Sequence, residues 1–316
     1  MLGQGILYFF ETCLLKTAKS EEFLIPFLVD EDRASSPPSL PSETRVINSS
    51  IINFFVVNFL YFIMKPEYAH YLLVKTREDY NLIADEFSIT RQNIWQEIRF
   101  LFDDYLIPKE KVLDLGCGNA RFYPLFKEKA VEYIGIDSSK DLINISKDMY
   151  PDADFRVEDA LELSFPDNYF NDIYSIAVLH HIPSEELRLK FLNEAKRVLR
   201  SGGFLILTVW KFHQIKQWFL LLKYTLLKII GKSKLDWKDI FEPWGKKAER
   251  YYHWFSKKEL EKLVKKAGFE IEKSGIVKNR NQNRQNIFIV AKKDGAIEPT
   301  PSVHVTGGAK NDFKNV

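Results

Sequence analysis

A glycine turn and a nearby carboxylate have residue types and spacing that can do chemistry. Gly116-Cys117-Gly118 directly follows a short apolar run, 112–115, which is typical of a buried strand. Backbone without side chains can turn tightly there and approach a ligand closely, and the helix-like sequence that follows presents its amide groups. Asp137 stands nineteen residues beyond Gly118, where a carboxylate accepts hydrogen bonds from ribose hydroxyls. The pattern therefore predicts a nucleoside-binding corner.

The turn departs from the dinucleotide pattern, because Arg121 occupies the position of its third glycine. Asp114 lies inside the strand, two residues before Gly116, and Asn119-Ala120 follows Gly118. These residues resemble motif I of the class I S-adenosylmethionine (SAM) methyltransferases, whose ligand has no pyrophosphate. The resemblance implies SAM as the cofactor.

Further cofactor contacts are expected at the ends of neighbouring strands. Asp159 follows a third predicted strand, 155–157, at a place where the class I fold has an acid that reaches the adenine amine. Because open α/β sheets bind ligands at the carboxyl ends of their strands, we expect these groups to meet at one edge. The predicted cofactor contacts are Asp114, Gly116, Cys117, Gly118, Asn119, Asp137, Ser138, Asp159, Ala160 and Ala177.

Strand and helix patterns alternate through the rest of the chain. Apolar runs predict strands at 112–115, 133–136, 155–157, 170–178 and 204–209, followed by an antiparallel pair at 269–277 and 285–291. A helix is expected to start at Ser184 and to end at Gly202-Gly203. We therefore predict an α/β fold: a Rossmann-like, doubly wound, seven-stranded sheet whose last strand is antiparallel.

Helices are expected before the first strand and after the fifth strand. Helical spacing over 67–106 predicts two N-terminal helices that close over the cofactor, with a break at 87–90 and Thr90 as an N-cap. The segment 215–230 is basic, aromatic-rich and amphipathic. It is interpreted as a lid helix within an insert at 211–250, with a partner-binding helix or an interfacial membrane anchor as alternatives.

The two ends of the chain differ in composition from the middle. Residues 46–64 carry no charge and approach transmembrane length, although Asn and Ser residues dilute the run. We expect a methyltransferase domain at 64–293, a native start at Met64 with residues 1–63 peripheral to it, and a disordered tail at 294–316. A membrane anchor at 46–64 is the alternative for the first segment.

Charge is unevenly distributed over this nearly neutral chain of net charge +2. Residues 211–293 hold 21 Lys and Arg against 8 Asp and Glu, which indicates a polyanionic partner or a solvated lysine face. Cys13 and Cys117 are the only cysteines, so a disulfide framework and a cysteine-based metal site are excluded. We expect a reducing cytoplasm and no metal.

Three longer patterns narrow the family. They are 80–91 with Trp95, 175–181 ending in His180-His181, and 242–244 followed by 250–255; Phe87-Ser-Ile-Thr-Arg91 with Trp95 and Arg250-Tyr-Tyr-His253 are the most specific parts. In this order they resemble the tRNA wobble-uridine carboxymethyl methyltransferases, which esterify the carboxylate of carboxymethyluridine in the anticodon loop. The resemblance covers 67–292 and implies tRNA as the substrate and a small zinc-binding activator protein as a partner.

A carboxylate acceptor is already ionised at neutral pH, so its methylation needs no general base. It needs cationic or hydrogen-bonding groups that hold one oxygen toward the methyl group, and Arg can do so bidentately. The predicted catalytic residues are Arg91, His181, Arg250, Tyr251 and His253, whereas Tyr252 and Trp254 are expected to pack.

One departure from the family pattern keeps the substrate open. Glu242 precedes Pro243-Trp244, where the family usually has an apolar residue. Two alternatives therefore stand beside the tRNA enzyme. One is a methyltransferase of a small molecule or a lipid or quinone precursor. The other is a SAM-sensing or scaffolding module without turnover.

Overall fold

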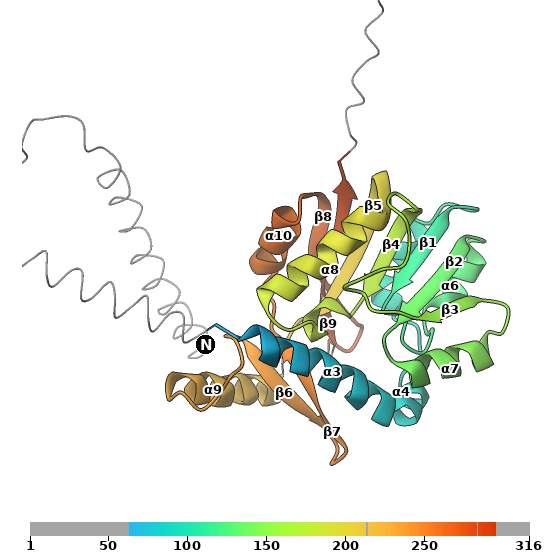
Figure 1. The fold of residues 1–316 in the computed structure, drawn as a ribbon. Helices are drawn as coiled ribbons and strands as arrows, with labels where there is room; N and C mark the ends of the chain where they lie inside the picture. Colours follow the sequence, from blue (N-terminus) through green and yellow to red (C-terminus); the bar gives the residue numbers. More distant parts are fainter. Residues whose placement is uncertain (1–62, 213, 283, 295–316) are drawn as a thin grey trace, which may run out of the picture.

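The computed structural model describes residues 63–212, 214–282 and 284–294. A seven-stranded sheet in the order β3-β2-β1-β4-β5-β9-β8 forms its centre (Figure 1). The first five strands run parallel, and β9 is antiparallel to both of its neighbours. The predicted class I fold is thereby confirmed. The strands are β1 (Lys111–Leu115), β2 (Glu132–Asp137), β3 (Asp154–Val157), β4 (Phe170–Ile176), β5 (Leu199–Trp210), β8 (Phe269–Lys278) and β9 (Gln285–Lys293).

Helices cover both faces of this sheet. On one face, α8 (Glu185–Val198) and α10 (Lys257–Lys266) bury side chains such as Phe191 and Leu260 against the strands. On the other face, α5 (Phe100–Asp103) and α6 (Tyr123–Glu128) pack with Phe102 against Val112 and Tyr174. The helix α7 (Lys140–Met149) packs beside β2 and β3. Alternating strand residues thus fill two separate apolar cores.

The ends of α8 show one confirmed and one wrong prediction. The Ser184 hydroxyl accepts a hydrogen bond from the Leu187 amide, as an N-cap should. The helix ends at Val198, however, and Gly202-Gly203 belongs to β5. A Cβ atom on Gly203 would lie 2.2 Å from the Asn171 carbonyl oxygen. These glycines therefore allow close strand approach, which a sequence pattern cannot distinguish from a helix stop.

The N-terminal helices are placed differently from the prediction. The elements are α3 (Pro66–Leu82), α4 (Ala84–Thr90) and a short 3-10 turn, η2 (Gln96–Ile98), before α5. The break falls at Ile83 rather than at 87–90, and Thr90 is the last residue of α4 instead of an N-cap. Its hydroxyl donates to the Glu86 carbonyl at 2.8 Å. The Thr90 hydroxyl is therefore bonded within α4 and does not cap the start of a following helix.

The insert after β5 contains more than the predicted lid helix. The helix α9 (Ile215–Ile229) is followed by a hairpin of β6 (Asp239–Trp244) and β7 (Ala248–His253), which forms a second sheet. In Figure 1, α3, α9 and this hairpin lie together at one end of the large sheet. The hairpin is joined to α10 through His253, whose Nδ1 lies 2.6 Å from Asp239 and whose Nε2 lies 2.9 Å from Glu259.

Candidate active site

A cavity of about 510 Å³ opens at the carboxyl ends of β1, β2 and β4, under α3 and α4. All ten predicted cofactor contacts line it: Asp114, Gly116, Cys117, Gly118, Asn119, Asp137, Ser138, Asp159, Ala160 and Ala177. Of the five predicted catalytic residues, Arg91 and His181 line it and the other three do not. The predicted cofactor contacts therefore all lie around one cavity, whereas the predicted catalytic residues do so only in part.

The glycine turn is shaped by its backbone. Gly116 has a φ of +85°, and a Cβ atom there would lie 2.4 Å from a methyl carbon of Val178. Gly118 also has a positive φ, and its amide donates to Asp137 Oδ2 at 3.0 Å, while the Ser139 amide donates to Oδ1 at 2.9 Å. The Asp137 carboxylate is thereby fixed in orientation, and each oxygen keeps a second lone pair for a ligand hydroxyl.

Burial raises the pKa of two groups that line the cavity. Asp114 is 2% exposed, and burial raises its pKa to about 7, although the Tyr133 hydroxyl donates to it at 3.1 Å. Burial also raises the pKa of the Cys117 thiol well above its ordinary value. A buried neutral thiol is a poor nucleophile, so Cys117 lines the cavity without the reactivity of a catalytic cysteine.

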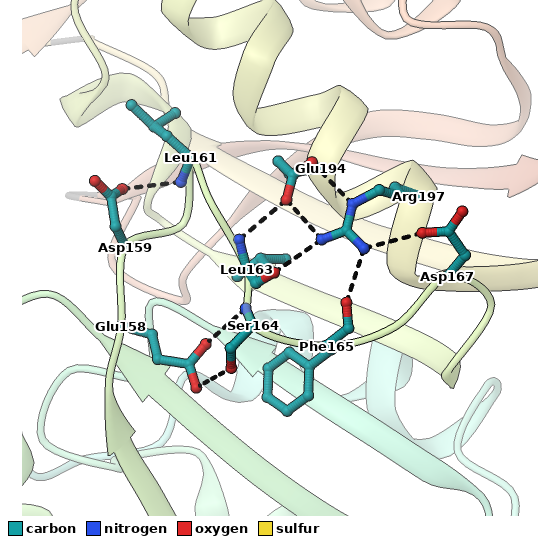
Figure 2. A network of polar contacts seen from close by, with 9 residues as sticks. All are labelled: Glu158, Asp159, Leu161, Leu163, Ser164, Phe165, Asp167, Glu194 and Arg197. Carbon is teal, nitrogen blue, oxygen red and sulfur yellow. Dashed lines mark hydrogen bonds and ion pairs between the residues drawn. The ribbon is translucent and has the colours of Figure 1, made fainter.

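The loop after β3 is held in place from α8, as Figure 2 shows. Arg197 donates to the backbone carbonyls of Leu163 at 2.9 Å and Phe165 at 2.7 Å, and its partner Glu194 accepts from the Leu163 amide. At the start of this loop, Asp159 accepts from the Leu161 amide through one oxygen. The loop thus positions Asp159 at the cavity wall with its second oxygen available to a ligand.

His181 is fixed between two hydrogen-bond partners. Its Nδ1 lies 3.0 Å from the carbonyl oxygen of Tyr251, and its Nε2 lies 2.9 Å from the Tyr80 hydroxyl. A carbonyl only accepts, so Nδ1 carries the proton and Nε2 of the neutral ring accepts from Tyr80. Burial lowers the pKa of His181 to about 3. At neutral pH the ring therefore orients Tyr80 rather than carrying charge.

Arg91 lines the cavity from the end of α4. Its guanidinium lies 5.4 Å from the ring centroid of Trp244, at the end of β6, and 5.9 Å from that of Phe87. The Trp244 indole in turn donates to Glu86 at 3.1 Å, which connects the hairpin to α4. Burial and the nearby Arg250 charge lower the pKa of Arg91.

Arg250 lies just behind the cavity wall and is 4% exposed. It packs 4.5 Å from the Trp244 ring centroid and 3.7 Å from Glu242. Its Nε and Nη1 atoms have no hydrogen-bond partner among the described residues. Burial raises the pKa of Tyr80, and the neighbouring Arg250 charge opposes that rise. Arg250 therefore adds positive potential next to a residue that lines the cavity.

Tyr251 and His253 are not brought to the cavity. Along β7, side chains alternate between the two faces, and the ring of Tyr251 packs among Met64, Ala69, Leu72 and Leu235. The His253 ring is occupied by Asp239 and Glu259. Tyr252 is fully buried and packs as predicted, with its ring 5.3 Å from that of Trp210 and 4.6 Å from that of His181. The hairpin register, which the sequence pattern did not reveal, decides which of these residues faces the site.

Arg121 also lines the cavity, although the sequence analysis did not assign it a site role. Its guanidinium lies 4.3 Å from the Trp95 ring centroid and 4.7 Å from that of Phe122. Its Nε has no hydrogen-bond partner among the described residues, and burial lowers its pKa to about 9. The available signal was its position, because an arginine replaces the third glycine of the nucleotide-binding pattern.

The family model for the methyltransferase domain matches residues 88–274, more than half of the chain. This chain belongs to the methyltransferase domain family. A SAM-dependent methyltransferase from Methanosarcina mazei has a similar structure, with a TM-score of 0.52 and 26% identity over 62% of this chain and 98% of that chain. Family and fold together make the chain a SAM-dependent methyltransferase.

Two curated relatives carry the name tRNA (carboxymethyluridine(34)-5-O)-methyltransferase. The one from Schizosaccharomyces pombe is 28% identical over 239 residues, which cover 68% of this chain and 94% of that protein. The one from Arabidopsis thaliana is 36% identical over 148 residues, which cover 47% of this chain and 35% of that protein. The matched part of the methyltransferase thus corresponds to nearly all of the first relative and to about a third of the second.

The residues of this methyltransferase fit SAM in chemical type. The orienting contacts on Asp137 and Asp159 leave carboxylate oxygens for ribose hydroxyls and for an adenine amine, and the glycine turn admits no side chain. Within the described residues, no group of three or more His, Cys, Asp and Glu side chains is placed to hold a metal ion.

Proposed function

We propose that this methyltransferase transfers a methyl group to the carboxylate of a carboxymethyl-modified wobble uridine in tRNA. The observation that carries the proposal is the presence of arginines in the cavity as well as acids. Asp114, Asp137 and Asp159 line the cavity together with Arg91 and Arg121, and Arg250 lies behind its wall. An anionic acceptor matches the arginines, and the two relatives named above are carboxymethyluridine methyltransferases.

Four residues that line the cavity have a proposed role in this reaction. Bound SAM supplies an electrophilic methyl group on a sulfonium centre. Asp137 and Asp159 hold the nucleoside part of SAM by accepting hydrogen bonds from its hydroxyl and amine groups. Arg91 and Arg121 hold the acceptor carboxylate by charge-assisted hydrogen bonds and orient one oxygen toward the methyl group.

No residue is needed to remove a proton from this acceptor, because a carboxylate is ionised at neutral pH. The geometry agrees with that chemistry. His181 lines the cavity, and its Nε2 lone pair is occupied by the Tyr80 hydroxyl. A ring whose Nδ1 proton and Nε2 lone pair are both engaged positions its neighbours instead of acting as a general base.

We further propose that residues 64–293 are the catalytic unit, that it acts in the cytoplasm, and that a small activator protein docks on it. The basic segment 211–293 is proposed to follow the phosphates of the tRNA stem. Among the described residues, no helix is long and apolar enough to cross a membrane.

The test uses the full chain, labelled SAM and bulk tRNA from a strain that accumulates carboxymethyluridine, with and without the activator. We expect label in tRNA that mild alkali releases, because a methyl ester is alkali-labile. Alkali-stable label would contradict the carboxylate acceptor while keeping tRNA as the substrate. Absence of label under both conditions, despite SAM binding, would overturn the proposal in favour of a small-molecule or lipid-precursor acceptor.

The first variant for this assay is Arg91→Ala. We expect methyl transfer to fall by about 10² or more, since charged hydrogen bonds to the acceptor are lost, while the Kd for SAM stays within about threefold. Isothermal titration of SAM measures the second quantity. Parallel loss of SAM binding and transfer would contradict an acceptor-positioning role for Arg91.

A further inference from the structure

The helix α9 presents a continuous apolar stripe to solvent. Its members are between 48% and 74% exposed, and they are Ile215, Phe219, Leu222, Leu226, Ile229 and Ile230. At about 100° per residue, all six fall within an arc of about 100° around the helix. Large apolar side chains that are exposed singly are ordinary, but a contiguous stripe marks an interaction site.

The opposite face of α9 is already used. Leu221 is buried with Ile240 and Tyr252, and the Tyr224 ring lies 5.9 Å from that of Phe241 on β6. The helix is therefore anchored on the hairpin through one face, and its stripe is held outward by that packing. This arrangement separates the stripe from the apolar cores of the domain.

Lysines accompany the stripe, and acids are absent from it. Lys216 and Lys223 are exposed and lie at about 80° to 100° on the same helical wheel, at one margin of the stripe. Lys232 and Lys234 follow the helix and are also exposed. The sequence from residue 211 to residue 235 contains six lysines and no Asp or Glu. Apolar and cationic groups are thus presented together on one surface.

We propose that α9 binds the surface of an anionic lipid bilayer, with the stripe inserted at the level of the headgroups and the lysines facing anionic lipids. An amphipathic helix with a cationic margin has this behaviour. Aliphatic side chains do not stack on bases, and five of the six exposed residues are Ile or Leu, so the stripe fits a lipid surface better than RNA. At about 1.5 Å per residue, fifteen residues span about 22 Å, which suits a helix lying in the interface rather than crossing it.

A second apolar surface continues the stripe at the C-terminal end of α9. The lining of a hollow there includes Ile63, Tyr71 and Ile229, three lysines (Lys65, Lys228 and Lys234) and one acid, Glu67. Ile63 is 52% exposed and Tyr71 is 54% exposed. The stretch that precedes Ile63 in the sequence, 46–62, is uncharged and rich in Phe, Ile and Val. The chain therefore joins the described domain beside the surface that α9 presents.

The test is co-sedimentation of the full chain with vesicles of phosphatidylcholine alone and of phosphatidylcholine with about 30 mol% phosphatidylserine. We expect binding to the anionic vesicles that weakens as salt is raised. The variant Phe219→Ser/Leu222→Ser/Leu226→Ser should lower the partition coefficient at least about tenfold, and Lys216→Glu/Lys223→Glu should lower it on anionic vesicles alone. A matched control, Ile107→Ser/Ile276→Ser, removes exposed apolar groups elsewhere and should bind as the unchanged protein does.

SAM affinity serves as the control for folding, because it depends on the cavity and not on α9. Absence of vesicle binding, or equal binding by the triple serine variant, would overturn the proposal. Loss of tRNA binding in the α9 variants without vesicle binding would show that the surface is an RNA interface instead. If neither the unchanged protein nor any variant methylated tRNA, the proposed substrate would be contradicted. The vesicle measurement would still decide the membrane proposal by itself.

Discussion

At the residue scale, the proposed acceptor site depends on two arginines that form no ion pair with the described residues. Arg121 lies between two aromatic rings with an unpaired Nε, and Arg91 lies beside Trp244 and Phe87. Stacking holds a guanidinium in place while its N–H groups stay available to a ligand. A planar site of this kind suits a carboxylate better than an uncharged hydroxyl or amine.

Arg121 can be separated from its neighbour Arg284 by experiment. Both guanidinium groups stack on Trp95, but Arg284 is paired with Glu97 at 2.7 Å and does not line the cavity. We expect Arg121→Met to lower kcat/KM for tRNA about tenfold to a hundredfold, because a charged hydrogen bond to the acceptor is lost. The matched variant Arg284→Met should change kcat/KM by less than about threefold.

Steady-state kinetics with tRNA measure kcat/KM of the Arg121→Met variant, and calorimetry measures its Kd for SAM. An unchanged Kd for SAM with a reduced kcat/KM is the expected pair of results. A loss of SAM affinity in Arg121→Met, with normal behaviour toward tRNA at saturating SAM, would instead assign Arg121 to the cofactor.

At the element scale, the sequence predicts the sheet and fails on the hairpin. The central strands β1 and β4 are buried on both faces, so the sequence marks them clearly, and the acids at the ends of β2 and β3 reach the same edge. β6 and β7 carry Glu242, Pro243 and Arg250 and show no such run. Their pairing comes from packing on α3 and α9, so the alternation that turns Tyr252 inward and Tyr251 away was invisible in the sequence.

The hairpin is secured by a buried ionic contact whose removal should be costly. His253 lies between Asp239 and Glu259, and the Asp239 side chain is fully buried. We expect His253→Ala to lower the free energy of unfolding by about 3 to 5 kcal/mol, because a buried carboxylate loses its partner. Urea denaturation at pH 7 measures the change. His70→Ala, at an exposed position, should alter it by less than about 0.5 kcal/mol.

Methyl transfer by the His253→Ala variant, measured where the protein is folded, gives a second test of the role of the hairpin. His181 is bonded to the Tyr251 carbonyl on the same strand, so a loosened hairpin should also disturb Tyr80 and the acceptor side. Unchanged stability together with lost transfer would point to a catalytic role for His253 after all, contrary to its place outside the cavity.

At the scale of the whole molecule, two buried carboxylates make the fold sensitive to pH. Burial raises the pKa of Asp114 and of Asp172 to about 7. The unfolded chain loses these protons near an ordinary pKa of 3.8, so above that pH the folded state binds more protons than the unfolded state. Their effect is therefore to lower stability as pH rises, and the loss grows until pH passes about 7.

Asp172 offers the cleaner test because it lies outside the cavity and is 3% exposed. Its Oδ1 accepts from the Phe204 amide at 2.9 Å, and the side-chain carbonyl of asparagine can accept the same bond. We expect Asp172→Asn to raise the free energy of unfolding at pH 8 by about 1 to 4 kcal/mol, since it removes a buried charge. The gain should shrink as pH falls below about 7 and vanish below 3.8.

Thermal and urea unfolding of both proteins between pH 4 and pH 8 give this difference directly. A gain that stays constant across the range would show that packing, and not the charge on Asp172, limits stability. The methyltransferase activity of Asp172→Asn should be unchanged at 25 °C, because β4 presents this side chain away from the cavity. In that case burial of the Asp172 carboxylate would lower the free energy of unfolding without contributing to activity, unlike the acids that line the cavity.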